Sequence, residues 1–143
     1  MKASVTWKDG MAFDAHLENY SFVIDADPSV GGHNLGPRPK GLTLVSLAGC
    51  TAMDVISILG KMKIQADIES FEVATDGVLE PELPKRIQAI TISYIFKGEK
   101  LPAVADKIKH AIQLSMETYC GVSATLRPTV KLSHKLIIND KEM

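Results

Sequence analysis

The sequence predicts an α+β fold in which antiparallel sheets surround one central helix. The first observation is a set of short segments at both ends of the chain that alternate between apolar and polar residues, as β-strands do. The second is the run over residues 41–63, which is apolar on nearly every side, a pattern typical of a helix enclosed by other elements. The third is the order of the expected elements, in which helices are segregated from hairpin-like strands.

Length and composition indicate one globular domain over residues 1–143. Hydrophobic residues make up 45% of the chain and charged residues 23%, which excludes a disordered chain. With a net charge of −1 and no basic stripe, a nucleic-acid partner is not expected. The beginning, "MKASVTWKDG", lacks the apolar core of a signal peptide, and with two cysteines we expect a cytoplasmic protein.

Three strands are expected first. Residues 2–8 carry β-formers, and Asp9-Gly10 is a strong two-residue hairpin signal. Residues 11–17 and 20–26 continue as the second and third strands. A meander of three strands is therefore expected.

A long loop then leads into the central helix. Residues 27–40 hold three prolines and three glycines, and long ordered loops beside a helix start often build sites. The helix is expected over residues 41–63. Its first twenty residues could just span a bilayer, but Asp54, the hydroxyl side chains and the small residues along it favour burial in protein, so no membrane partner is expected.

The second half is expected to hold three strands and one helix. Residues 67–78 and 86–96 alternate as strands, and 130–138 closes the chain as another. Pro102 opens a helix that runs to Tyr119. One strand face and one helix face are apolar: Ile90, Ile92, Tyr94 and Phe96 in the strand, and Val104, Ile108, Ala111, Ile112, Ser115 and Tyr119 in the helix.

The central helix also predicts a second copy. An apolar helix of this length is hard for the strands of a 143-residue chain to cover on every side. A homodimer with an apolar interface would cover it, and we therefore expect one.

The two cysteines, Cys50 and Cys120, leave several interpretations open. Free cysteine often packs as a small hydrophobe, and Cys50 lies within the apolar helix. Chemistry would need its thiolate, which burial disfavours, so a cation would have to approach it, and Asp54 one turn on would oppose ionisation if it faced the same way. Cys120 stands before Gly121, where exposure is expected. The spacing does not tell whether the two sulfurs meet.

Other chemistries lack their signatures. The histidines, His16, His33, His110 and His134, show no metal-ligand spacing, so neither a metal nor a cofactor is expected. The chain has no GxGxxG, no GxxxxGK[ST] and no GxSxG motif.

Two segments carry a family resemblance. The first is "GPRPKGLTLVSLAGCTAMDVISIL" and the second is "LSMETYCGVSATL". Together they resemble the two signature segments of the OsmC/Ohr family, named for osmotically induced and organic hydroperoxide resistance proteins, and most closely its shorter OsmC-like branch. The resemblance extends over essentially the whole chain. It implies an intertwined α+β homodimer with its central helices buried.

The resemblance also implies a thiol peroxidase. In the family the first motif cysteine, here Cys50, attacks the peroxide and becomes a sulfenic acid. The second, here Cys120, condenses with it to a disulfide that an external dithiol reduces. An apolar pocket at the dimer interface would suit organic hydroperoxides, whose alkyl tails gain from burial.

The chain departs from the family at the activating pair. Family peroxidases carry a glutamate nine positions before the first cysteine, where this chain has Gly41 in "PKGL". They also carry an arginine in an early strand, whereas the first arginine here is Arg38, in the loop. Arg38 is the candidate activating cation, the alternative being a solvated loop charge. Two further hypotheses are therefore kept: a non-catalytic protein that binds a small apolar or acidic ligand, and a redox sensor.

Overall fold

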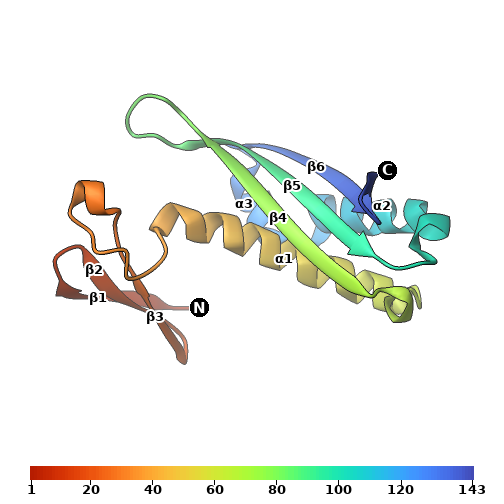
Figure 1. Cartoon of the computed structure of the whole chain (residues 1–143), viewed down its shortest axis with the longest axis horizontal. Coiled ribbons are helices and arrows are strands. Elements are labelled where there is room, and N and C mark those ends of the chain that lie inside the picture. The colour runs from red at the N-terminus through yellow and green to blue at the C-terminus, as the bar shows by residue number, and fades with distance from the viewer. The chain divides into compact units, whose positions relative to one another are not determined.

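The computed structural model describes residues 1–143 and divides them into two compact units, Met1–Thr43 and Leu44–Met143. The first unit holds β1 (Ala3–Asp9), β2 (Ala12–Leu17) and β3 (Tyr20–Ile24), paired antiparallel in that order (Figure 1). The predicted three-stranded meander is confirmed. A single domain over 1–143 remains a prediction.

Asp25 organises the loop after β3, which includes the short turn η1 (Pro28–Val30). Its side chain is 3% exposed and accepts hydrogen bonds from the backbone N–H groups of Ala26, His33 and Leu35 at 2.7, 2.8 and 3.1 Å. These bonds favour the carboxylate and lower the pKa of Asp25 despite its burial. The prediction of a long ordered loop is thus confirmed.

Helix α1 (Pro39–Lys61) begins and ends two residues earlier than predicted. Four residues at helical spacing form its buried stripe: Leu47, Thr51, Val55 and Leu59. Its other sides are half-buried or exposed, with Val45 66% and Met53 74% exposed. The chain therefore encloses α1 on one stripe only, as expected of a helix too apolar for one chain to cover. By length and composition alone α1 could also cross a membrane. Core helices pass the same test, so this is weak evidence for a membrane span.

The second unit contains a four-stranded sheet. Its order is β4 (Ser70–Leu79), β5 (Ile87–Lys97), β6 (Lys131–Ile138) and β7 (Lys141–Glu142). Strands β4 and β5 pair antiparallel as predicted. Strand β7, which the sequence did not predict, pairs antiparallel with β6, but β5 and β6 pair parallel. The expectation of a purely antiparallel sheet is wrong at this pair, because a helical crossover between β5 and β6 returns the chain to the same end of the sheet.

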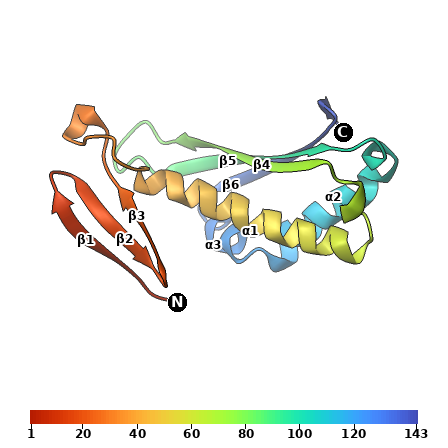
Figure 2. The same ribbon diagram turned by 60° about the horizontal axis from the view of Figure 1, so that its bottom comes forward.

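That crossover consists of four short helical segments: η3 (Leu101–Val104), α2 (Ala105–Leu114), η4 (Ser115–Tyr119) and α3 (Gly121–Leu126). In the second unit α1, α2 and α3 lie on one face of the sheet, and the short turn η2 (Gln65–Asp67) joins α1 to β4 (Figure 2). The unit is therefore a two-layer structure, with one helical layer and one sheet.

Segment η4 is a π-helical turn, and it changes which residues face the core. Ile108, Ala111, Ile112 and Ser115 are buried as predicted. Tyr119 was expected on the same face and is 60% exposed, so that prediction is wrong. A π-turn takes up more residues than an α-turn, which shifts the residues after it around the axis. Met116 and Cys120 are buried instead.

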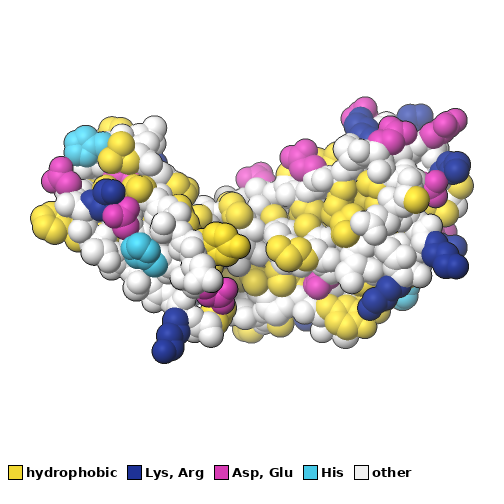
Figure 3. Space-filling view, turned by 90° about the horizontal axis from the view of Figure 1, so that it is seen from below, with side chains coloured by type: hydrophobic (Ala, Val, Ile, Leu, Met, Phe, Trp, Pro, Cys, Tyr) yellow, Lys and Arg dark blue, Asp and Glu magenta, His cyan; other side chains and the backbone are white.

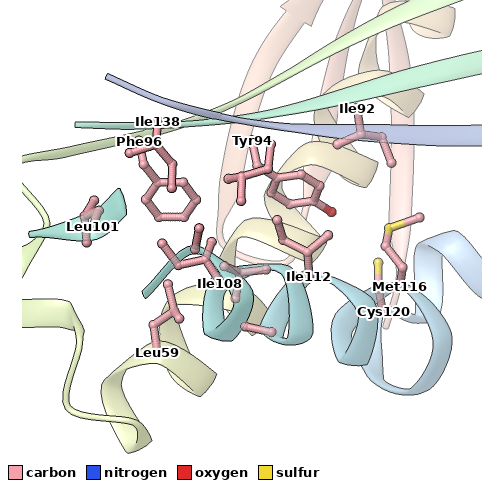
Figure 4. Close-up of a cluster of buried hydrophobic side chains, with 14 of the residues drawn as sticks. Leu59, Ile92, Tyr94, Phe96, Leu101, Ile108, Ile112, Met116, Cys120 and Ile138 are labelled. Atoms are coloured by element: carbon pink, nitrogen blue, oxygen red, sulfur yellow. The ribbon is translucent and has the colours of Figure 1, made fainter. Parts of the chain in front are cut away.

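The core lies between the sheet and the helices of the second unit. The predicted apolar face of β5 is confirmed, since Ile90, Ile92, Tyr94 and Phe96 are at most 1% exposed. Figure 4 shows Tyr94 and Phe96 directed from the sheet toward the helical layer, with Cys120 at one end of the cluster. This core positions the second cysteine.

Candidate thiol site

The structure brings the two cysteines together. Cys50 lies in the middle of α1 and is half-buried, whereas Cys120 lies between η4 and α3 and is 3% exposed. The two Sγ atoms and a carboxylate oxygen of Asp54 all lie within 4.8 Å of one another. Both cysteines are free thiols. A modest approach of the side chains would bring the sulfurs to disulfide distance, about 2.05 Å.

Cys120 is the more buried of the two thiols, so the prediction that it is exposed is wrong. Its backbone is extended (φ −70°, ψ 101°) between two helical segments. Its sulfur accepts a hydrogen bond from the Ser123 N–H at 3.4 Å, which caps the first turn of α3. Burial is the main cause that raises the pKa of the Cys120 thiol, and the neighbouring Cys50 adds to it.

A chain of hydroxyl groups leads from the sheet to the thiols. Tyr94 Oη lies 2.6 Å from Thr51 Oγ1, which lies 2.8 Å from Ser115 Oγ. Ser115 Oγ in turn donates to Asp54 Oδ2 at 2.9 Å. Burial raises the pKa of Tyr94 to about 12, so its hydroxyl keeps its proton at neutral pH. These hydrogen-bonded hydroxyl groups hold the Asp54 carboxylate beside the two sulfurs.

The position of Asp54 decides the electrostatics of the site. It lies one helical turn after Cys50, and its carboxylate is next to both sulfurs. This is the arrangement in which the sequence analysis expected Asp54 to oppose ionisation of Cys50. A carboxylate so close repels a thiolate, and a stable thiolate here needs a positive charge to compensate.

Arg38, the candidate for that charge, belongs to the first unit. It donates to the Gly36 carbonyl at 2.9 Å and forms an ion pair with Asp27 at 3.3 Å. It directly precedes α1, and Cys50 lies eleven residues (50 − 39) beyond the first residue of that helix. The role of Arg38 stays a prediction.

Arg127 is a cation that the sequence analysis missed. Its Nη2 donates to the Met116 carbonyl and lies 3.5 Å from Ser123 Oγ. Ser123 Oγ itself donates to the Cys120 carbonyl at 2.9 Å. Arg127 therefore positions the turn that carries Cys120. Arg127 directly follows the second signature segment and precedes Pro128, and neither position had marked it as a site residue.

Two concave regions are relevant to ligands, one in each unit. In the second unit a groove of about 340 Å³ reaches Asp54, between Ser57 and Lys61 of α1 and Tyr119. In the first unit a larger and mainly apolar hollow of about 610 Å³ is lined by β-strand residues and by Arg38. The groove gives solvent a route to the carboxylate beside the thiols.

Comparison with known proteins identifies relatives. The family model described as OsmC-like protein matches residues 32–135. Protein YhfA of Escherichia coli strain K12 is 29% identical over 135 residues, covering 94% of this chain and 95% of YhfA.

Solved structures share the fold. A hypothetical protein from Aquifex aeolicus superposes with a TM-score of 0.79 at 22% identity, covering 96% of this chain and 95% of that one. An organic hydroperoxide resistance protein OsmC from Legionella pneumophila gives 0.67 at 14% identity, with 95% of each chain covered. At these identities the likeness is one of fold. The family model covers most of the chain, and this chain belongs to the OsmC-like protein family.

Proposed function

We propose that this protein is a thiol peroxidase that reduces organic hydroperoxides, or hydrogen peroxide, through Cys50 and Cys120. The observation that carries the proposal is the approach of the two sulfurs to within 4.8 Å, although 70 positions (120 − 50) separate them in sequence. Cys50 is the less buried of the two thiols, which favours it as the one that meets the peroxide, and the buried Cys120 is close enough to react with the oxidised product.

The chemistry takes two steps. The Cys50 thiolate attacks one oxygen of the peroxide, the O–O bond breaks, and the alkoxide takes a proton and leaves as an alcohol. Cys50 is now a sulfenic acid. The Cys120 thiol then attacks its sulfur, the sulfenic oxygen leaves as water, and the disulfide forms. An external dithiol restores both thiols by exchange.

A homodimer forms part of the proposal. Val45 and Met53 on the outer side of α1 are mostly exposed in one chain, and large exposed apolar patches mark interfaces. Figure 3 shows hydrophobic side chains gathered on the face viewed there, with few charges among them. Arg38 stays the candidate cation that activates Cys50 in this proposal. We further propose that the protein works in the cytoplasm, without nucleic acid or membrane as partner.

Peroxide reactivity tests the proposal. Reduced, chelator-treated protein is mixed with cumene hydroperoxide or hydrogen peroxide, and thiol loss is followed. Wild type should form an internal disulfide, Cys120→Ser should over-oxidise, and Cys50→Ser should be inert. If Arg38 is the activating cation, Arg38→Ala should slow the reaction by about tenfold or more, and an unchanged rate would mean that Arg38 is a solvated loop charge. Wild-type thiols that react no faster than free cysteine would refute the proposal.

A second candidate function is non-catalytic binding of a small apolar or acidic ligand, with redox sensing as a variant of it. Gly41 stands where the family peroxidases carry glutamate, and Arg38 pairs with Asp27. Both observations favour slow thiols. In the same assay, slow formation of the disulfide with a change in dimerisation would indicate a sensor.

A further inference from the structure

We infer that Cys50, Asp54 and Cys120 form a binding site for a thiophilic divalent cation, with Zn²⁺ as the ion that fits best. This inference goes beyond the peroxidase proposal and does not depend on it. Its starting point is that three potential ligand atoms, two sulfurs and one carboxylate oxygen, lie within 4.8 Å of one another.

The geometry is close to that of a bound ion. Zinc binds thiolate sulfur at about 2.3 Å and carboxylate oxygen at about 2.0–2.2 Å, usually in a tetrahedron. Two sulfurs on one tetrahedral zinc are then about 3.8 Å apart. The largest separation here exceeds that by at most about 1 Å, so small side-chain rotations can close the site. Cys50 and Asp54 are held at a fixed spacing by one turn of α1.

The ligand types select the ion. Thiolates favour zinc and other thiophilic metals, whereas magnesium and calcium prefer oxygen ligands alone. Three protein ligands leave the fourth tetrahedral position open for water, as in catalytic zinc sites. The divalent charge also compensates the repulsion among two thiolates and a carboxylate. None of the ion pairs of the second unit involves these three residues, so no side-chain cation in an ion pair does this in place of the metal.

Neighbouring residues donate hydrogen bonds to two of the three ligands. Ser115 Oγ donates to Asp54 Oδ2, which orients the carboxylate and leaves its other oxygen available. The Ser123 N–H donates to the Cys120 sulfur. Outer hydrogen bonds of this kind orient the ligands in metal sites. The groove that reaches Asp54 supplies an entry path for the ion.

Cobalt titration tests the inference. Reduced wild-type protein, without oxygen, is titrated with Co²⁺ and then with Zn²⁺ as a competitor. We expect one Co²⁺ per chain, with the near-ultraviolet charge-transfer absorption of thiolate-bound cobalt and its loss when zinc is added. Asp54→Asn should weaken binding about tenfold or more. Cys50→Ser should lose about half of the charge-transfer intensity or all binding.

The matched control is Asp106→Asn, which removes an exposed carboxylate of α2 outside the site. Its affinity should equal that of wild type. Far-ultraviolet circular dichroism verifies that each variant is folded, and Asp54→Glu, which keeps a carboxylate, should retain more affinity than Asp54→Asn. Wild type without thiolate absorption, or Asp54→Asn with wild-type affinity, would overturn the inference. The peroxidase assay is run with chelator, so each proposal can fail alone.

Discussion

The Thr51 hydroxyl is the junction of the buried chain that joins Tyr94 to Asp54, and replacing it with valine tests how much that chain contributes to stability. Valine has nearly the shape of threonine, so no cavity forms. The change leaves the Tyr94 hydroxyl, 2.6 Å from Thr51 Oγ1, without its partner in a fully buried position. An unsatisfied buried hydroxyl costs about 1–3 kcal/mol.

Ser115 loses less, because it keeps its bond to Asp54 and forfeits only the 2.8 Å contact to Thr51. That loss is about 1 kcal/mol. Thr51→Val should therefore lower the free energy of unfolding by about 2–4 kcal/mol. Thr51→Ser keeps the hydroxyl and deletes one methyl group, which should cost about 1 kcal/mol.

Urea unfolding followed by circular dichroism measures both changes, at one chain concentration because dimerisation would add to the apparent stability. The slope of the free energy against urea should not change. A Thr51→Val protein within about 0.5 kcal/mol of wild type would refute the reasoning, since that is the range of ordinary surface changes. Equal losses for the two variants would mean that the hydroxyl contributes no more to stability than the methyl group does.

Three other outcomes are expected. Met53→Glu should convert a dimer to single chains in sedimentation, because Met53 is 74% exposed in one chain; an unchanged dimer would place the interface elsewhere. The pKa of Tyr94, about 12 in the folded protein against 10.0 ordinarily, gives stability of about 3 kcal/mol that is present below pH 10 and lost between pH 10 and 12. The ultraviolet difference between wild type and Tyr94→Phe should locate that step, and a midpoint near 10 would contradict it. Gly36→Ala should lower the melting temperature, because the new Cβ would lie 2.0 Å from the Val23 carbonyl oxygen. At Gly49 a new Cβ would meet no atom within 4 Å, so Gly49→Ala should raise the free energy of unfolding by about 0.5–1 kcal/mol. Equal shifts of the melting temperature in the two variants would contradict this.

The fold was predictable wherever a local pattern decides the structure. Alternation along β5 placed Tyr94 and Phe96 on the buried face, and the hairpin signal Asp9-Gly10 placed the turn of the first sheet. Strand direction was not predictable in the same way, because the parallel pairing of β5 with β6 depends on where the crossover helices return the chain. Periodicity carries no information about that return.

The candidate site was predictable only in part. The two sulfurs were identified by resemblance, but the burial of Cys120 was not, because a single π-turn moves Tyr119 outward and Cys120 inward. The partners of Asp54 were also missed. Ser115 lies 61 positions away from it and Cys120 lies 66 (120 − 54), so no spacing rule brings them together.

Asp54 links the two proposals through one electrostatic effect. Its carboxylate is within 4.8 Å of the Cys50 sulfur. At that separation the repulsion of a thiolate is about 0.9 kcal/mol in water and about 3.5 kcal/mol at an effective dielectric constant of 20, and a half-buried site lies between these limits. Removing the charge should therefore lessen the repulsion of negative charge on the Cys50 sulfur.

Asp54→Asn in a Cys120→Ser background isolates this effect at Cys50. With chelator present, iodoacetamide should alkylate the Cys50 sulfur at pH 7 about fivefold or more faster than in Cys120→Ser alone. An unchanged or slower rate would show that the carboxylate does not act on the sulfur. In the wild-type background the same Asp54→Asn change should weaken cobalt binding, because a negative charge that repels a thiolate attracts a cation. Faster alkylation of Cys50 together with weaker cobalt binding in Asp54→Asn would therefore show that the Asp54 carboxylate both slows the thiol and binds the metal ion.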